Sequence, residues 1–193
     1  MKLVINLILA VLIGLLAYVL YTSINEPIAF QAEKSKRKNA VVKSLQNIRS
    51  AQELYRGVTG EFAATFDTLR EVLNTGTFKL VNVQGDPDDP NNPEAVVYDT
   101  VFKPAIDSVN SLGVILDKME LIPYGEGKAF DIAADTLTYQ QTVVPVVEVG
   151  TFWKDFMGEF ANTKYTKYDS NYDPNARMKF GSMEAPQLGG SWD

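Results

Sequence analysis

The pattern of apolar and polar positions changes twice along the chain. Residues 3–21, LVINLILAVLIGLLAYVLY, form an uncharged run with one polar side chain, Asn6. From Val41 onward the apolar positions recur every three or four residues, and after Gly76 several segments alternate apolar and polar residues. A uniform run predicts a helix in apolar surroundings, the wider spacing predicts a helix with one buried face, and alternation predicts strands.

The first run is long enough to cross a membrane. As a helix, residues 3–21 would be about 28 Å long, close to the roughly 30 Å hydrocarbon thickness of a bilayer. Tyr18 and Tyr21 fit the aromatic belt at the interface. A cleaved signal peptide has a shorter apolar core and a cleavage site of small residues, which YVLYTSINEP lacks, and a buried soluble helix would show separate faces. We therefore expect an uncleaved, single-pass transmembrane anchor at residues 1–24.

Charges near the span bear on its orientation. Lys2 and the terminal amine precede it, while the basic residues of the run 34–38 lie 13 to 17 residues beyond it. Positive charge alone gives no clear orientation. A short amino-terminal tail before a large carboxyl-terminal domain is typical of a signal-anchor, and Glu26 and Glu33 separate the span from the basic run. We expect a cytoplasmic amino terminus, an anchor in the inner (cytoplasmic) membrane, and the remainder in the periplasm.

A stem helix is expected over residues 25–60. Pro27 should interrupt the membrane helix by a kink or a short break, because proline lacks a backbone donor and disfavours a helical predecessor. Beyond it, four residues share one helix face and are expected to pack on the sheet of the head, with Gln52 as a polar exception on that face: Val41, Leu45, Ile48 and Tyr55.

The lower part of this stem has no apolar face. Between Phe30 and Val41 the same stripe is occupied by Lys34 and Arg37. We expect this part to be solvated or bound to a partner, and the run EKSKRK offers the further possibility of contact with anionic lipid headgroups.

Residues 61–193 are expected to form an α+β head. Gly57 and Gly60 provide the end of the stem helix, and Thr65 or Asp67 can cap a short helix that stops at Gly76. The segments with strand alternation are residues 78–84, 118–124, 128–139 and 143–152, and 125–127 (Gly-Glu-Gly) reads as a hairpin turn. The pattern over residues 96–111 favours no single element. The predicted fold is thus α+β: a long amino-terminal helix, comprising span and stem, with a small antiparallel-sheet head.

Composition limits the available chemistry. The 193-residue chain has no histidine and no cysteine, which removes the usual general base, the commonest metal ligands and every thiol nucleophile. Residues 1–59 carry 8 Lys/Arg against 3 Asp/Glu, and residues 60–193 carry 10 against 21. A basic stem therefore bears an acidic head, which is unsuited to nucleic acid because basic surfaces supply most of that affinity.

The acidic loop GDPDDPNNPE, residues 85–94, is the candidate metal site. Asp86, Asp88 and Asp89 offer the oxygen ligands that calcium prefers. The loop lacks the spacing of an EF-hand, and proline-rich acidic loops are commonly solvated connections. Calcium and a solvated loop both remain open, and we expect no other cofactor.

Carboxylates also raise the question of hydrolysis. Asp131 with Asp135, or Glu120 with Glu148, could face each other across strands. No nucleophile motif accompanies them, and the usual requirements of an active site are unmet. We expect no enzymatic activity.

The carboxyl-terminal tail is rich in aromatic residues. Tyr165, Tyr168 and Tyr172 recur at helical intervals, but the residues around them favour irregular structure. The tail either packs on its own domain or docks on a neighbouring subunit, where buried Trp and Tyr are common anchors.

The stretch LQNIRSAQELYRGVTGEFAATFDTL, residues 45–69, resembles type IV pilin-like proteins, including type II secretion pseudopilins. Together with the apolar span, the resemblance extends over residues 3–75. The motif residues that carry it are Ala51-Gln52, Tyr55, Gly60, Phe62 and Leu69. The resemblance implies a pilin-like fold and membership of an envelope assembly.

Two features depart from that family. Pilins carry a basic leader ending in glycine and a glutamate near the mature amino terminus, whereas this chain begins MKLV and has Asn6 as its early polar residue. The departures favour a pilin-like protein held permanently in the membrane over a bulk pilus subunit. A bitopic scaffold of the machinery that assembles such fibres is a related possibility.

These inferences lead to a functional hypothesis. We expect a non-enzymatic, membrane-anchored structural subunit of a pilin-like or secretion-type cell-envelope assembly. Its partners would be the lipid bilayer and other protein subunits, in a homo- or hetero-oligomer formed through the membrane helix and stem. The alternative is a stand-alone, membrane-tethered periplasmic adaptor or binding module.

Overall fold

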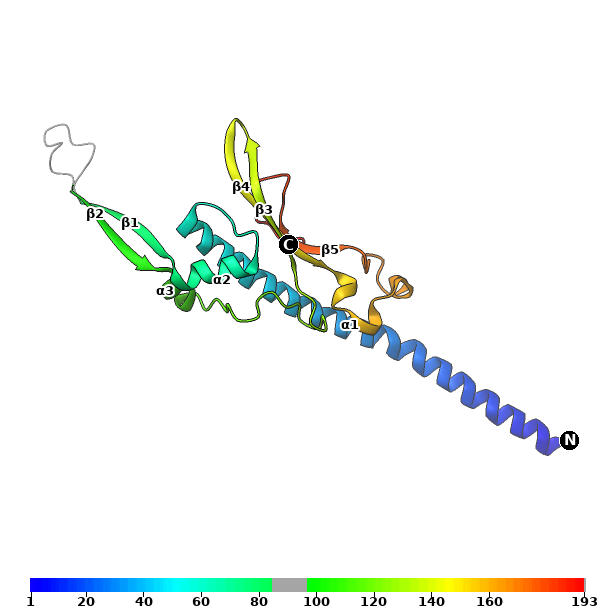
Figure 1. The fold of residues 1–193 in the computed structure, drawn as a ribbon. Helices are drawn as coiled ribbons and strands as arrows, with labels where there is room; N and C mark the ends of the chain where they lie inside the picture. Colours follow the sequence, from blue (N-terminus) through cyan, green and yellow to red (C-terminus); the bar gives the residue numbers. More distant parts are fainter. Residues whose placement is uncertain (85–96, 193) are drawn as a thin grey trace.

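One long helix organises the molecule, and the head lies along its carboxyl-terminal half (Figure 1). The computed structural model describes residues 1–84 and 97–192. The helices are α1 (Lys2–Thr59), α2 (Phe66–Thr75) and α3 (Ala105–Ser111), and the strands are β1 (Thr77–Gln84), β2 (Val97–Pro104), β3 (Asp131–Tyr139), β4 (Thr142–Phe152) and β5 (Arg177–Gly181). The described residues also form three short 3-10 turns: η2 (Trp153–Asp155), η3 (Gly158–Phe160) and η4 (Thr163–Lys167). The predicted α+β layout is confirmed.

Helix α1 continues through Pro27, so of the two expected interruptions, a kink or a short break, the break does not occur. It runs for 58 residues with Pro27 inside. The Asn25 side chain donates to the Tyr21 carbonyl at 3.0 Å, one turn earlier. Glu26, just before the proline, and Phe30, one turn beyond it, are held by contacts from the head. Tertiary contacts therefore maintain a helix that local sequence disfavours.

The two glycines at the end of α1 have different roles. Gly60 adopts φ 87°, in the left-handed region, and its N–H donates to the Arg56 carbonyl at 2.8 Å. This is the conformation that commonly ends a helix. Gly57 lies inside the helix, where a Cβ atom would stand 2.8 Å from the Phe78 ring. Gly57 therefore permits close packing, and only Gly60 makes the turn that was expected of both.

The core lies between the upper half of α1 and the head. Val41, Leu45 and Ile48 are fully buried, and Tyr55 is 9% exposed, so the predicted buried face is confirmed. Gln52 is fully buried on the same face. Its side chain donates to the carbonyl of Ala63 and accepts from the N–H of Ala63, both at 2.9 Å. This amide satisfies the backbone of the loop that leads from α1 into the head.

Asn47, like Gln52, forms two hydrogen bonds with the backbone of a single residue in the head. Its side chain accepts from the N–H of Ile115 at 2.9 Å and donates to the carbonyl of Ile115 at 2.8 Å. Helix α2 also follows prediction, because the Thr65 hydroxyl accepts from the N–H of Thr68 and Gly76 ends the helix. Helix α1 thus fixes two loops of the head through side-chain amides.

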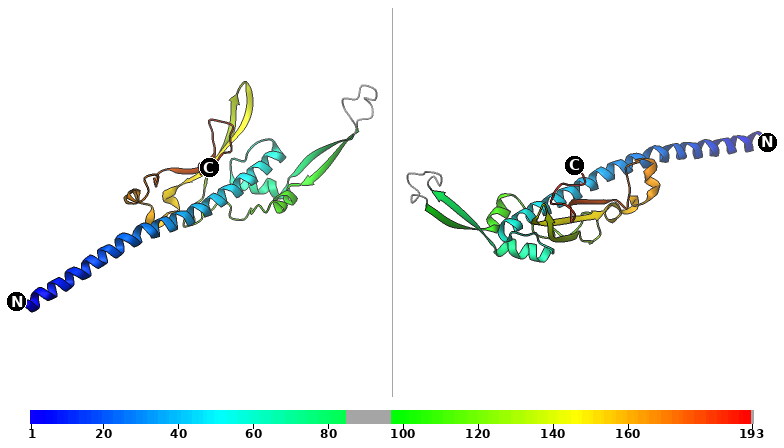
Figure 2. Two further views of the ribbon diagram at one scale, coloured as in Figure 1. Left: turned by 180° about the vertical axis from the view of Figure 1, so that it is seen from behind. Right: turned by 90° about the horizontal axis from the view of Figure 1, so that it is seen from above.

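The head contains two separate antiparallel sheets. Strands β1 and β2 form a two-stranded ribbon in which Thr77 lies opposite Pro104 and Gln84 opposite Val97. The other sheet has the order β3-β4-β5. The ribbon points away from the amino-terminal half of α1 in all views (Figures 1 and 2). Three of the four predicted strands are confirmed, with their bounds shifted by three residues or fewer.

Three details of the prediction need correction or completion. Residues 118–124 form turns and one isolated bridge between Leu121 and Ala129, because Lys118 and Tyr124 have positive φ values that a strand does not allow. The unassigned segment 96–111 contributes β2 and α3, which meet at Pro104. Strand β5, in the tail, was not predicted.

Candidate functional site

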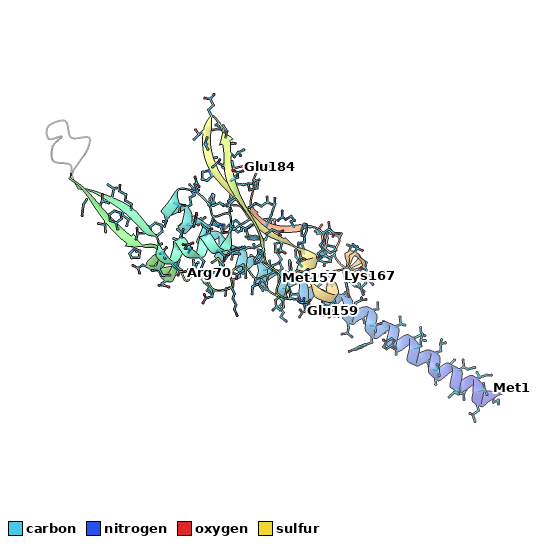
Figure 3. All side chains as sticks on the ribbon, viewed as in Figure 1. Met1, Arg70, Met157, Glu159, Lys167 and Glu184 are labelled. Carbon is cyan, nitrogen blue, oxygen red and sulfur yellow. The ribbon has the colours of Figure 1, made fainter. Side chains whose placement is uncertain are left out.

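The amino-terminal half of α1 is apolar and bare. Leu3 is 81% exposed, Leu9 is 55% exposed and Leu20 is 63% exposed. Within the described residues, α1 is the one helix that is long and apolar enough to cross a membrane. Side chains of this kind surround the helix (Figure 3), so lipid or another apolar helix is the environment that suits them.

An aromatic cluster closes on α1 just beyond this apolar half. We name it the aromatic clasp, and it consists of Phe30, Phe160, Tyr165, Tyr168 and Tyr172. Phe30 is fully buried. Its ring stacks on Tyr165 with centroids 5.1 Å apart and meets Tyr172 edge-on at 5.0 Å. The tyrosines of the tail therefore pack within their own chain and fix it to the stem.

Tyr172 is the most deeply set hydroxyl of the clasp. It is 2% exposed, and its hydroxyl donates to the Phe160 carbonyl at 2.8 Å. Burial, reinforced by Asp173 and Tyr165, raises the pKa of Tyr172 to about 12. The ring therefore stays neutral at physiological pH and serves packing.

Polar contacts surround the clasp on its amino-terminal side. The Tyr168 hydroxyl donates to a Glu26 carboxylate oxygen at 2.6 Å. The ammonium groups of Lys164 and Lys167 lie 3.7 and 3.6 Å from the same carboxylate. The hydrogen bond from Tyr168 and the two nearby cations lower the pKa of Glu26. Glu26 thus links the first residues outside the apolar run to turn η4.

One face of the lower stem is covered by its own head, whereas Ser35, Lys36 and Asn39 are exposed, so the expected solvation holds for only part of this segment. Lys34 forms an ion pair with Asp169, and Arg37 donates to the Phe156 carbonyl at 2.8 Å. The Lys34 ammonium lies 5.6 Å from the centre of the Trp153 ring. The hydrogen bond from Lys34 lowers the pKa of Asp169. These cations therefore dock the irregular segment that follows β4, which explains the missing apolar stripe.

The ribbon of β1 and β2 exposes apolar side chains far from the clasp. Leu80 and Val101 are register partners and are 50% and 48% exposed. Val81 and Phe102 are 52% and 64% exposed. Because the sheet has two strands, no further strand covers these residues among those described. The ribbon is a candidate surface for a protein partner.

A cleft lies between the end of α1 and the second sheet. Its volume is about 410 Å³. Arg56 and Phe62 line one side, residues 144–147 of β4 line another, and Leu188 of the tail lines a third. The lining is mainly apolar, and its one charged side chain is Arg56.

The predicted site residues are not brought together in the described part of the structure. Asp86, Asp88 and Asp89 lie outside the described residues. Glu120 pairs with Arg70 at 2.6 Å. Elsewhere within residues 1–84 and 97–192, no group of three acidic side chains is placed to hold a metal ion.

The carboxylates of the second sheet pair with cations or backbone. Glu148 lies opposite Ala133, and contacts Arg177 at 2.9 Å and Lys179 at 2.6 Å. Asp131 contacts Arg177 at 3.3 Å. Asp135 accepts from the N–H of Thr136 at 2.7 Å. The expected pairs of facing carboxylates are therefore absent for these four positions.

The polar contacts beside the clasp, between Glu26 and the lysines of η4, were not predicted from the sequence. The signal available was the dipeptide Lys-Tyr, which occurs at 164–165 and again at 167–168. A spacing of three places both lysines on the same side of a 3-10 turn. Nothing in the sequence indicates that this side meets Glu26, since the two segments are about 140 residues apart.

Comparison of the chain with protein-family models, with curated proteins and with solved structures finds no match. The outline of the molecule, a long amino-terminal helix with a head of small antiparallel sheets, is loosely pilin-like. The pilin interpretation therefore depends on the motif of residues 45–69 and on this outline.

Proposed function

We propose that this protein is a non-enzymatic, membrane-anchored structural subunit of a pilin-like or secretion-type cell-envelope assembly. The observation that carries the proposal is the division of α1. Its first half is apolar and bare, while its second half forms the core of the head without a break in the helix. A lateral contact between membrane helices would then be transmitted to the heads through one rigid element.

The apolar half offers a surface for such a lateral contact. Ala10 and Gly14 are four residues apart and lie on one helix face. Among the described residues, a Cβ atom at Gly14 would meet no heavy atom within 4 Å apart from the helix's own backbone. Small residues at this spacing allow two helix backbones to approach closely in a membrane. This face supports association between copies or with a related subunit.

Cross-linking tests the association. The chain has no cysteine, so a cysteine introduced at Ala10 is unique and reports proximity between subunits in native membranes. We expect a disulfide-linked dimer that is lost when Gly14→Ile is added. The matched control is Val19→Ile, an increase in volume on the opposite face of the helix. Failure to cross-link at any position along the span would contradict lateral association.

We further propose an inner-membrane location with the head in the periplasm. The support is the large, acidic folded head that follows the apolar run. A membrane-impermeant maleimide tests the topology. In intact cells with a permeable outer membrane, Thr142→Cys should react and Lys2→Cys should not. The reverse pattern would place the head in the cytoplasm.

A stand-alone, membrane-tethered adaptor is the second candidate, and a bitopic scaffold of assembly machinery is a variant of the first. The cleft beside Arg56 and the exposed ribbon favour the adaptor, because each is a surface that a separate ligand or partner can occupy. Size measurement in mild detergent separates the candidates. A chain that stays monomeric at high concentration, with its membrane neighbours present, favours the adaptor.

A further inference from the structure

Turn η4 carries two exposed lysines at the end of the head that is nearest to the apolar half of α1. The side chains of Lys164 and Lys167 are both 55% exposed. In each view the segment around η4 is the part of the head closest to the bare helix (Figures 1 and 2), and Lys167 is labelled where the helix leaves the head (Figure 3). The contacts with Glu26 fix both lysines to α1 at this level.

The height of Glu26 above the apolar run can be calculated from helix geometry. Glu26 is five residues beyond Tyr21, which corresponds to about 7.5 Å along the helix axis. A bilayer has a hydrocarbon core of about 30 Å and a total thickness of about 40–45 Å, which leaves roughly 5–7 Å for the headgroups on each side. With Tyr21 at the edge of the hydrocarbon, Glu26 and its two lysines lie at the outer limit of the headgroup layer.

The charge of the head is distributed along the same axis. The two segments around the clasp, 26–38 and 154–169, contain seven Lys/Arg and five Asp/Glu. The rest of the chain beyond residue 60 contains 7 Lys/Arg and 18 Asp/Glu. A strongly acidic head would be repelled by an anionic membrane. The head segment 154–169 is balanced, with three basic and three acidic residues, and residues 26–38 of the stem add the basic excess at this end, whereas the rest of the head is strongly acidic.

We propose that Lys164 and Lys167 bind the phosphate groups of anionic phospholipids in the membrane that holds α1, so that the base of the head is seated on the bilayer surface. This inference depends on the membrane anchoring proposed above. It places the lipid contact elsewhere than the run 33–38, for which the sequence offered such contact as one possibility. In the structure, Lys34 and Arg37 of that run are turned toward the head.

Glu26 positions the two lysines and removes only part of their charge. One carboxylate faces two ammonium groups, so the group keeps a net charge of +1. Tyr168 also holds the carboxylate, through its hydroxyl. Lysine side chains can place apolar stems along the protein and charged ends at the headgroups. Glu159, exposed in the neighbouring turn η3, is the acidic residue that opposes this contact.

A spin label at position 166 tests the contact in the full-length chain. Thr166 is exposed between the two lysines, and Thr166→Cys gives a unique attachment site. The chain is placed in nanodiscs of phosphatidylcholine alone or with phosphatidylglycerol, and collisions of the label with a neutral water-soluble nickel complex are measured. Because each lysine near an anionic surface favours contact by roughly fivefold, we expect accessibility to be about twofold or more lower in anionic discs.

Matched variants identify which residues cause the difference in accessibility between the two kinds of nanodisc. The pair Lys164→Gln and Lys167→Gln should abolish the difference between the two kinds of disc, whereas Lys79→Gln with Lys103→Gln, equal in charge but on the distal ribbon, should preserve it. Glu26→Gln frees the lysines and should preserve or increase the protection. Loss of protection in Glu26→Gln would show instead that the lysine variants act by loosening the clasp, and would overturn the proposal.

The outcomes also separate this inference from the anchoring on which it depends. A chain that enters nanodiscs but shows equal accessibility at position 166 in both lipids contradicts the lipid contact alone. A chain that does not enter nanodiscs contradicts the anchoring. A label at Thr142→Cys, on the distal hairpin of β3 and β4, should remain equally accessible in both lipids, and lipid-dependent protection there would contradict a contact confined to the base.

Discussion

The two halves of α1 share one continuous backbone but differ in which of their side chains are buried. Residues 3–21 present apolar side chains in every direction, with no protein covering them among the described residues. In residues 30–55 a single face is buried, and the opposite face is polar and exposed. A helix that is apolar all round requires an apolar environment, while a helix with one apolar stripe requires a single packing partner. The comparison shows that one continuous helix can combine a half suited to apolar surroundings with a half suited to packing on a folded head.

The boundary between the halves is defined by side chains from the far end of the sequence. Residues 153–172 supply the rings and charges that meet Glu26, Phe30 and Lys34. Phe30, the clasp residue on α1, lies nine residues, or about two and a half turns, beyond Tyr21, the last residue of the apolar run. The head is therefore attached close to the end of the apolar run, with little free stem between them.

Replacement of Phe30 should give the largest loss of stability. Phe30→Ala removes a fully buried ring from the clasp and leaves a cavity, which costs about 3–5 kcal/mol. Ile28→Ala is the matched control, since Ile28 is 62% exposed on the same helix, and it should change the free energy of unfolding little. Urea unfolding in detergent, followed by Trp153 fluorescence in a Trp192→Phe background, measures both. Equal losses would contradict the boundary at Phe30.

A charge should reduce membrane insertion when it is placed in the first half of α1, and should leave insertion unchanged when it is placed on the polar face of the second half. Leu12→Lys places an ammonium near the centre of the span, where insertion costs about 2.5–3.5 kcal/mol. Gln46→Lys places the same group on the exposed face of the stem. We expect Leu12→Lys to reduce the fraction recovered in membranes and Gln46→Lys to leave it unchanged. Similar recovery of both variants would show that residues 3–21 are not in lipid.

The buried amide of Gln52 should be sensitive to loss of its polar atoms. Gln52→Leu keeps much of the volume but leaves the N–H and carbonyl of Ala63 without partners, which costs about 1–3 kcal/mol. Gln46→Leu is the control on the exposed face and should change stability by less than about 0.5 kcal/mol. The free energy of unfolding measures the difference. An unchanged free energy of unfolding for Gln52→Leu would mean that water or another polar group replaces the two hydrogen bonds of Gln52.

Acid should weaken the clasp, and we expect this effect to be the smallest. The pKa values of Glu26 and Asp169 are lowered from 4.5 and 3.8 by their hydrogen bonds with Tyr168 and Lys34. The stabilisation is therefore complete above the ordinary values and is lost as pH falls through the lowered ones. Trp153 fluorescence should change below about pH 4.5. Glu26→Gln with Asp169→Asn should flatten this dependence, and an unchanged curve would assign the transition to other groups.

Local patterns predicted the parts of the fold whose partners are near in sequence. The buried face of Val41, Leu45 and Ile48 follows from spacing alone, and the cap of α2 at Thr65 follows from residue type. Three sheet segments were recognisable by alternation. The anchor at residues 1–24 is also indicated by sequence, although its membrane and orientation remain proposals.

Features that depend on distant contacts were not predictable. Pro27 remains inside a helix because Glu26 and Phe30 are held by the tail. Lys34 and Arg37 looked solvated because their partners, Asp169 and the Phe156 carbonyl, lie more than 100 residues away. The segment 118–124 alternates like a strand, yet its backbone turns at positive φ. The candidate calcium ligands Asp86, Asp88 and Asp89 remain a prediction.

Separating the two halves of α1 shows whether the first half is what holds the chain in the membrane. The full chain and a chain of residues 25–193 are expressed in parallel, and membranes are extracted with alkaline carbonate. We expect the full chain to stay with the membranes, and the shorter chain to be released with the near-ultraviolet dichroism of a packed head. Release of the full chain, or retention of the shorter one, would contradict the division of α1 between lipid and protein.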